Sequence, residues 1–283
     1  MTEPAPPAAT ATPGLFPSAV RIFDLSLGQM LWSRRSVFLG VLLGGPVAIA
    51  IALRIIESLA TSGFMVNGAQ IRGDAIFGGV IWLLFIRVIV PLLGVFYGTA
   101  LIADEVDDKT ITYLFTRPIP RSAVVVGKYL AYLAVTVLIV LPSIMLVFFL
   151  VMPIGGGSIA QSFPDLLKDL LLLAAGLAVY GALFAFIGAR LKRPLLIGLF
   201  FAFGWEQVVM TVPGYLRRFS VAYYLQSLVP QAMPGDGVTS ILQTFFKDTP
   251  PAWTAVTGLL VILAVSLAFA ARAVEGREYV LEQ

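Results

Sequence analysis

Long apolar runs dominate this 283-residue chain and constrain its fold more than any other feature. Hydrophobic residues make up 59% of the sequence and charged residues 12%, whereas soluble domains hold about 45–50% and about 25%. A helix of about 20 apolar residues crosses a bilayer. Six runs meet this criterion, over residues 36–56, 76–101, 124–150, 168–189, 194–213 and 252–271. The sequence therefore predicts an all-α polytopic membrane protein with six transmembrane helices.

Basic residues predict the orientation of these spans. With both termini in the cytoplasm, the inner segments hold twelve of the nineteen Lys and Arg residues, and the outer segments hold six. Cytoplasmic loops of membrane proteins collect Lys and Arg, so both termini are expected inside. Residues 1–14 are rich in Pro, Ala and Thr and are expected to be a disordered tail. The remaining residues, 15–283, are expected to form one transmembrane domain.

Two regions beside the spans are amphipathic rather than spanning. Residues 17–33 place apolar side chains at helical spacing, which predicts an N-terminal helix in the inner interface, with simple packing as the alternative. Residues 214–251, between spans 5 and 6, are too apolar for a solvated loop. They predict outer helices that re-enter or lie in the outer leaflet, and a plain surface cap is the alternative.

The chain contains neither Cys nor His. Zinc, haem, iron–sulfur and most copper sites draw on these two side chains, and many hydrolytic mechanisms use His as the general base. No metal site and no catalytic residue are therefore expected, which removes most classes of membrane enzyme.

One charged segment interrupts the apolar pattern between spans 2 and 3. Residues 103–122, ADEVDDKTITYLFTRPIPRS, begin with four acids in a run of five residues and end on two prolines and two arginines. Val106, Tyr113 and Leu114 fall on one helical face. Acids in the first turn and Arg117 near the end complement the helix dipole, and Pro118 ends the helix. The pattern predicts a short helix lying across the inner membrane surface.

The acidic residues at 104–108 allow two interpretations. They supply oxygen ligands of the kind that Mg²⁺ takes together with substrate phosphates, as in a membrane-embedded Mg-dependent prenyl or lipid transferase. That chemistry needs a second acidic motif, and the candidate pair, Asp165 and Asp169, is predicted on the opposite side of the membrane. The favoured interpretation is a docking helix for a cytoplasmic partner. A passive channel is disfavoured, because no span is polar enough to line a wide aqueous pore.

Read with its flanks, this segment resembles the permease subunit of ABC-2-type exporters, whose pattern is E-x-x-x-G-T…L…P-x-S-R…G-K. The resemblance rests on Glu105 to Thr110, Tyr113-Leu114, Arg117 to Arg121 and Gly127 to Ala131. Lys109 stands where the family usually has Gly, and Pro120 where Ser is common. The spans and flanking helices fit the same family along the whole chain. Residues 204–225 are similar to the branch associated with multicopper-enzyme maturation.

The resemblance implies a transport subunit, not an enzyme, in the bacterial inner membrane. Two cytoplasmic ABC ATPase subunits would bind MgATP, because this chain has no G-x-x-x-x-G-K-[ST] phosphate loop and is expected to hold no cofactor. A second permease copy or homologue would pair with it in the bilayer, and no nucleic acid is involved. The contacts with the ATPase are expected at Glu105, Thr110, Tyr113, Leu114, Arg117 and Arg121 in the coupling helix.

Two charges fall inside predicted spans, Arg87 in span 2 and Glu206 in span 5. Placing an ionised group at such depth costs about 3 kcal/mol on insertion scales. Each side chain is therefore expected to face protein or water and to have a partner. Their similar depths predict that the two side chains pair. They either line the export pathway or form a buried ion pair that fixes the packing of two helices.

Overall fold

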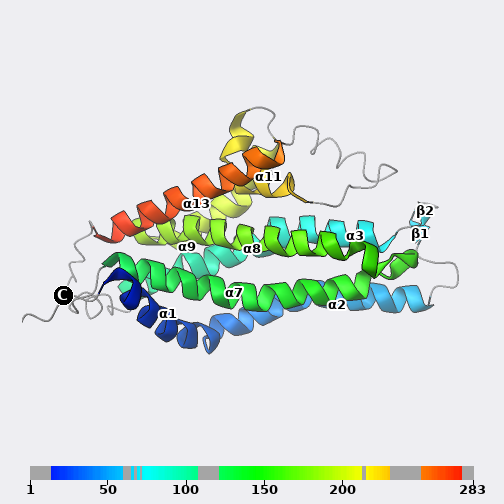
Figure 1. The fold of residues 1–283 in the computed structure, drawn as a ribbon, viewed down its shortest axis with the longest axis horizontal. Coiled ribbons are helices and arrows are strands. Elements are labelled where there is room, and N and C mark those ends of the chain that lie inside the picture. Colours follow the sequence, from blue (N-terminus) through cyan, green and yellow to red (C-terminus); the bar gives the residue numbers. More distant parts are fainter. Residues whose placement is uncertain are drawn as a thin grey trace, which may run out of the picture.

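The computed structural model describes residues 14–59, 65–66, 69–70, 72–107, 121–211, 215–229 and 250–275. Nearly all of this part is helical, and long helices run side by side along the molecule (Figure 1). The described strands, β1 (Met65–Val66) and β2 (Ala69–Gln70), form one short antiparallel ribbon. The predicted all-α fold is confirmed, with this ribbon as a small addition at one end of the bundle.

Five described helices are long and apolar enough to cross a membrane: Ser36–Leu59, Gly73–Asp104, Ser122–Val151, Ile159–Arg190 and Ala252–Glu275. They correspond to α2 (Arg34–Leu59), a composite helix that begins with α3, α7 (Arg121–Val151), α8 (Ile159–Arg190) and α13 (Ala252–Glu275). Because a span needs about 20 apolar residues, these helices support a multi-pass membrane protein.

The fifth predicted span, residues 194–213, is shorter in the structure than the other spans. Residues 194–211 form α9 (Pro194–Leu199), the π-helical segment η4 (Phe200–Trp205) and α10 (Glu206–Thr211). The apolar part is Pro194–Met210, which at 1.5 Å per residue is about 26 Å long. That falls below the roughly 30 Å of a hydrocarbon core, so the described structure holds five full-length candidates and one short helix.

The composite second helix joins α3 (Gly73–Gly79), η1 (Val80–Ile89), α4 (Val90–Leu93), η2 (Gly94–Gly98) and α5 (Ala100–Asp107). Its segments η1 and η2 are π-helical, with hydrogen bonds between residues five apart instead of four. Pro91 lies at the start of α4, where η1 gives way to α-helix. Arg87 lies in η1, so the widened helix carries one of the two intramembrane charges.

The α8 helix lies at the centre of the bundle and begins earlier than predicted. Its first residue is Ile159 rather than residue 168. Pro164 lies within the first two turns, where a proline removes few helical hydrogen bonds. Asp165 and Lys168 form an ion pair at 2.8 Å on the helix surface. Neither the proline nor the charges therefore end the helix.

Close packing around α8 depends on small residues. A Cβ atom added at Gly94 or Gly98 would lie 2.8 Å from Tyr180 or 2.9 Å from Phe184 of α8. The Tyr132 ring of α7 lies directly against Gly181, and its hydroxyl donates a hydrogen bond to the Leu177 carbonyl at 2.9 Å. Absence of side chains on these glycines brings the three helices into direct contact.

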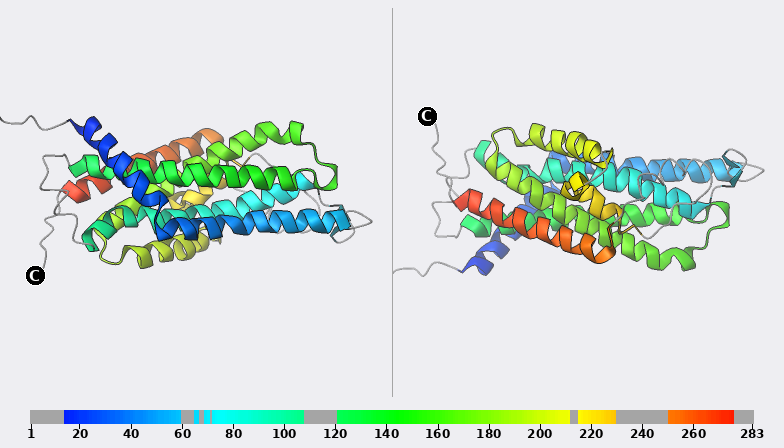
Figure 2. Two further views of the ribbon diagram at one scale, coloured as in Figure 1. Left: turned by 90° about the horizontal axis from the view of Figure 1, so that it is seen from below. Right: turned by 90° about the horizontal axis from the view of Figure 1, so that it is seen from above.

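The remaining described elements lie at the ends of the long helices. The first helix, α1 (Leu15–Leu31), crosses α7 obliquely (Figure 2). A 3₁₀ turn, η3 (Ile154–Gly156), leads from α7 into α8. Two short helices, η5 (Tyr215–Phe219) and α11 (Val221–Gln226), precede α13. The start of α1, the end of α5, the start of α7 and the end of α13 all lie at one end of the bundle.

Candidate functional site

The predicted coupling segment begins inside a continuous helix. In the structure α5 runs without a break from Ala100 to Asp107, so Asp104 belongs to the last turns of the composite span. The sequence had placed the acids in the first turn of a separate helix. Residues 103–107 contain neither Gly nor Pro, and therefore nothing in them ends the helix. Asp104 thus lies near the end of the composite helix and not, as predicted, at the start of a separate one.

Most of the predicted coupling contacts fall outside the described residues. Thr110, Tyr113, Leu114 and Arg117 lie there, and Glu105 is described for its backbone alone. Arg121 is the first residue of α7. The α5 and α7 helices contact each other, so both ends of the segment lie at the same end of the bundle (Figure 1). The assignment of these six residues to ATPase coupling stays a prediction.

Gly127, which the sequence analysis placed in the family pattern, marks the crossing of α1 and α7. A Cβ atom at this position would lie 2.6 Å from the Ala19 carbonyl oxygen and 2.9 Å from the Ile22 Cβ. The buried face of α1 consists of Ser18, Ala19, Ile22 and Ser26. The side chains of this buried face are smaller than those expected on the apolar face of an interfacial helix. Small side chains let α1 approach α7 closely.

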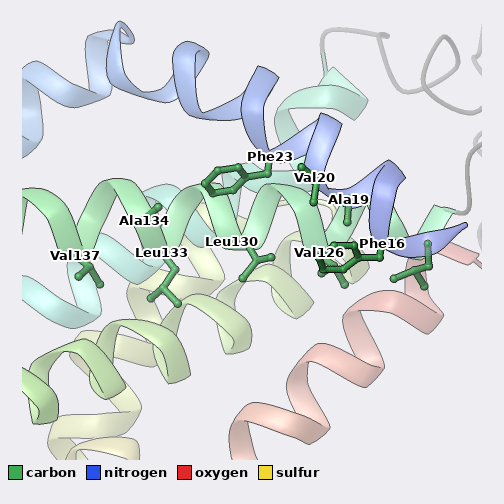
Figure 3. Close-up of a pocket in the computed structure, with 10 residues that line it drawn as sticks. Phe16, Ala19, Val20, Phe23, Val126, Leu130, Leu133, Ala134 and Val137 are labelled. Atoms are coloured by element: carbon green, nitrogen blue, oxygen red, sulfur yellow. The ribbon is translucent and has the colours of Figure 1, made fainter.

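An apolar groove of about 730 Å³ follows this crossing. Figure 3 shows Phe16, Val20 and Phe23 on α1, and Leu130 and Val137 on α7. Every side chain that lines the groove is apolar. Such a surface offers no group for acid–base or metal chemistry. It extends the apolar exterior that a membrane helix presents to lipid.

Arg87 contacts α10, which belongs to the short fifth predicted span. Its guanidinium donates a hydrogen bond from Nη1 to Oε1 of Gln207 at 3.0 Å. The guanidinium carbon also lies 4.8 Å from the ring centre of Trp82, within the range of a cation–π interaction. Arg87 is half-buried, whereas Trp82 is buried. The arginine therefore joins η1 to α10 through a neutral amide.

Glu206 is the most completely enclosed charged group of this site, with 2% of its surface exposed. Its carboxylate accepts hydrogen bonds from the Ser220 hydroxyl and from the backbone N–H groups of Val221 and Ala222, at 3.0 and 3.2 Å for the last two. Ser220 is the N-cap of α11 and accepts the Tyr223 N–H at 3.2 Å. The helix start supplies donors and a favourable dipole for a carboxylate.

The two intramembrane charges are neighbours, but they do not form the predicted ion pair. Arg87 and Glu206 interact electrostatically, and buried Tyr180 of α8 interacts with both. The ion pairs of the described residues join other groups: Arg54–Glu57, Arg72–Asp74 and Lys168–Asp165. Glu206 is satisfied by the start of α11, and Arg87 bonds the adjacent residue, Gln207. The correction has a physical basis, because a helix start can balance a carboxylate as a basic side chain does.

Sequence reasoning missed three members of this site: Gln207, Ser220 and Tyr180. Ser220 carried a usable signal, since a serine before an apolar helical stretch predicts an N-cap. Gln207 and Tyr180 carried none, because their roles depend on which helices meet in space. Among the described residues, no three acidic side chains gather into a cluster that could hold a metal ion.

The chain matches one protein-family model, described as ABC-2 family transporter protein, over residues 25–279. The match includes all the long helices, the charged segment between α5 and α7, and both intramembrane charges. No functionally curated protein matches the sequence significantly. The branch associated with multicopper-enzyme maturation is not distinguished by this match.

Proposed function

Because the chain belongs to the ABC-2 family of transporter proteins, we propose that it is the permease subunit of an ATP-driven exporter. ATP would be hydrolysed by separate cytoplasmic ABC ATPase subunits, two of them, and cargo would leave across the inner membrane. The observation that carries this proposal is the family match over almost the whole helical bundle. The family match gives no support to the alternative, a transferase that uses the acidic residues at 104–108.

Coupling to the ATPase is assigned to the segment between α5 and α7. The segment leaves the bundle at the end where α1 begins and α13 finishes, which fits cytoplasmic termini and a cytoplasmic partner. Both flanking helices are continuous with predicted spans 2 and 3. A push on the segment would therefore reach two membrane helices directly. Tyr113 and Leu114 are proposed as its apolar contacts with the ATPase.

The η5 and α11 helices are proposed to re-enter the membrane from the outer side. Leu225 of α11 packs on Gly176, which lies near the middle of α8, and a Cβ atom there would be 3.1 Å from the Leu225 side chain. Val221, Ala222, Leu225 and Gln226 are buried. The Glu206 carboxylate fixes the start of α11 at this depth. A polar backbone inside a membrane requires protein partners of this kind.

A second permease copy or a homologue is proposed to complete the transporter. The described chain exposes many large apolar side chains, among them Val41, Leu171 and Phe200, each more than 70% exposed. Lipid covers some of this surface, and a second copy would cover the rest.

The test is co-purification of the ATPase with a coupling variant. Tyr113→Asp combined with Leu114→Asp is expected to abolish capture of the ATPase while membrane insertion stays normal. Tyr113→Phe with Leu114→Met is the matched control, since it changes the same two positions and keeps both side chains apolar. It is expected to retain the ATPase. Undiminished capture by the first variant would refute the assignment of this segment.

A further inference from the structure

The Arg87 guanidinium has more hydrogen-bond donors than the protein uses. An arginine carries five N–H donors and a full positive charge. The described structure gives it one hydrogen bond, to the neutral Gln207 amide oxygen, and the Trp82 ring on one face. None of the ion pairs among the described residues includes Arg87. Its charge is therefore matched at a distance and not by a direct acceptor anion.

Glu206 does not serve as that acceptor. Three donors already occupy its two oxygens, and all three come from the start of α11. The carboxylate is almost fully enclosed, whereas Arg87 is half-buried. The positive group is thus the accessible member of the pair, and the negative group is committed to holding α11.

The surroundings of Arg87 are apolar and open. Leu83 lies about one turn before Arg87 and is 52% exposed, and Val208, next to Gln207, is 59% exposed. Phe203 lies about one turn before Gln207 and is 39% exposed. A cation in a membrane helix faces protein or a water-filled cavity rather than lipid. The face around Arg87 therefore combines a partly exposed cation with apolar side chains.

We infer that Arg87, with Gln207 and Trp82, binds the anionic group of an amphiphilic molecule that the transporter carries. The guanidinium fork matches a phosphate or carboxylate, Gln207 orients it, and the exposed apolar side chains contact the hydrophobic body. This inference rests on the proposed transport function and adds a chemical class of cargo to it.

Binding can be measured on the full-length chain in nanodiscs of zwitterionic phosphatidylcholine, with radiolabelled dodecyl phosphate as the probe. Dodecanol has the same chain without the charge, and inorganic phosphate has the charge without the chain. The wild-type chain is expected to bind dodecyl phosphate saturably, and neither competitor is expected to displace it at equal concentration. Displacement by dodecanol or by inorganic phosphate would overturn the inference. This comparison needs no variant.

Variants then locate the site. Arg87→Gln is expected to weaken binding about tenfold or more, because it removes a charge-assisted hydrogen bond. Arg87→Lys keeps the charge but loses the fork, and is expected to bind less tightly than wild type and more tightly than Arg87→Gln. Lys168→Gln is the matched control, since it removes an exposed cation paired with Asp165, and its binding should equal that of wild type. Equal binding by Arg87→Gln and wild type would overturn the inference.

Bulk lipid identifies the source of the ligand. If dodecyl phosphate no longer binds in nanodiscs of anionic phosphatidylglycerol, the lipid competes for the site, which would support a membrane lipid as the molecule recognised. Undiminished binding would support another anionic amphiphile. The assay contains no ATPase, so its outcome is separate from ATPase capture. Failed probe binding with normal ATPase capture would overturn the cargo class and leave the proposed function in place. Normal probe binding with failed ATPase capture would overturn the proposed function and leave the binding site in place.

Discussion

The Glu206 carboxylate accepts the backbone N–H of Val221, 15 residues further along the chain, at 3.0 Å. Glu206 is the first residue of α10, and Val221 is the first residue of α11. A single side chain therefore connects α10, the last described part of the fifth predicted span, with the helix that packs on the middle of α8. Several predictions about stability depend on this connection.

Glu206 and Ser220 are expected to act as one unit. Glu206→Gln should lower the free energy of unfolding by about 2 kcal/mol, because it weakens hydrogen bonds made by a buried charge. Ser220→Ala should cost about 1 kcal/mol, because it removes an N-cap. The double variant should lose clearly less than the two losses added together. Denaturant titration in mild detergent would measure all three.

The control for that cycle is Ser227→Ala, which removes a hydroxyl at the other end of α11 whose hydrogen bond goes to the Tyr224 carbonyl. It should combine additively with Glu206→Gln, since Ser227 does not bond the carboxylate. If the losses in free energy of unfolding caused by Glu206→Gln and Ser220→Ala also added, the carboxylate would not depend on the N-cap.

Gly127 is expected to be indispensable for the packing of α1. Gly127→Ala places a methyl group 2.6 Å from the Ala19 carbonyl oxygen, so α1 must shift or detach. Overpacking of this kind costs about 1–3 kcal/mol. Thermal unfolding in detergent would measure the loss, and protease cleavage between α1 and α2 would report detachment.

Gly40→Ala serves as the comparison for Gly127→Ala. A Cβ atom at Gly40 would meet nothing within 4 Å in the described chain, and alanine has the higher helix propensity by about 1 kcal/mol. The variant should be neutral or more stable than wild type. A loss at Gly40 as large as the loss at Gly127 would show that the crossing of α1 and α7 is not what requires glycine at position 127.

Gly156 tests backbone conformation apart from packing. Its φ angle is +79°, and a Cβ atom there would contact nothing within 4 Å. Alanine in this left-handed region costs about 1–2 kcal/mol. Gly156→Ala should lower the free energy of unfolding by that amount, while Gly79→Ala, at a helical and equally open position, should not. Equal effects of the two substitutions would contradict the conformational explanation.

The sequence predicted the long helices well because their signal is local. The ends of spans 1 to 3 in the structure lie within about one turn of the predicted ones. The predicted start of the fourth span, residue 168, lies nine residues after the first residue of α8, since Pro164, Asp165 and Lys168 resemble a helix end. Their context decides otherwise, because Asp165 and Lys168 satisfy each other on the helix surface.

The contacts of the candidate site were less predictable because they join distant segments. Arg87 and Gln207 are 120 residues apart, and no periodicity in either helix indicates the other. Opposite charges at similar depth favoured an Arg87–Glu206 pair. The start of α11 supplied a nearer partner for Glu206 than a basic side chain. A search for N-caps around buried acids would have named Ser220, but not Gln207.

Removal of both intramembrane charges should not restore a stable protein. If Arg87 and Glu206 satisfied each other, Arg87→Leu with Glu206→Leu would fold better than either single variant. In the structure, loss of the Glu206 carboxylate leaves the Ser220 hydroxyl and the Val221 and Ala222 N–H groups without their acceptor. Each buried unsatisfied group costs about 1–3 kcal/mol.

The double variant should therefore be no more stable than Glu206→Leu alone, whereas Arg87→Leu alone should fold and lose probe binding. Size-exclusion chromatography and denaturant titration of the three variants would test this order. Recovery of stability in the double variant would show that the two charges depend on each other after all.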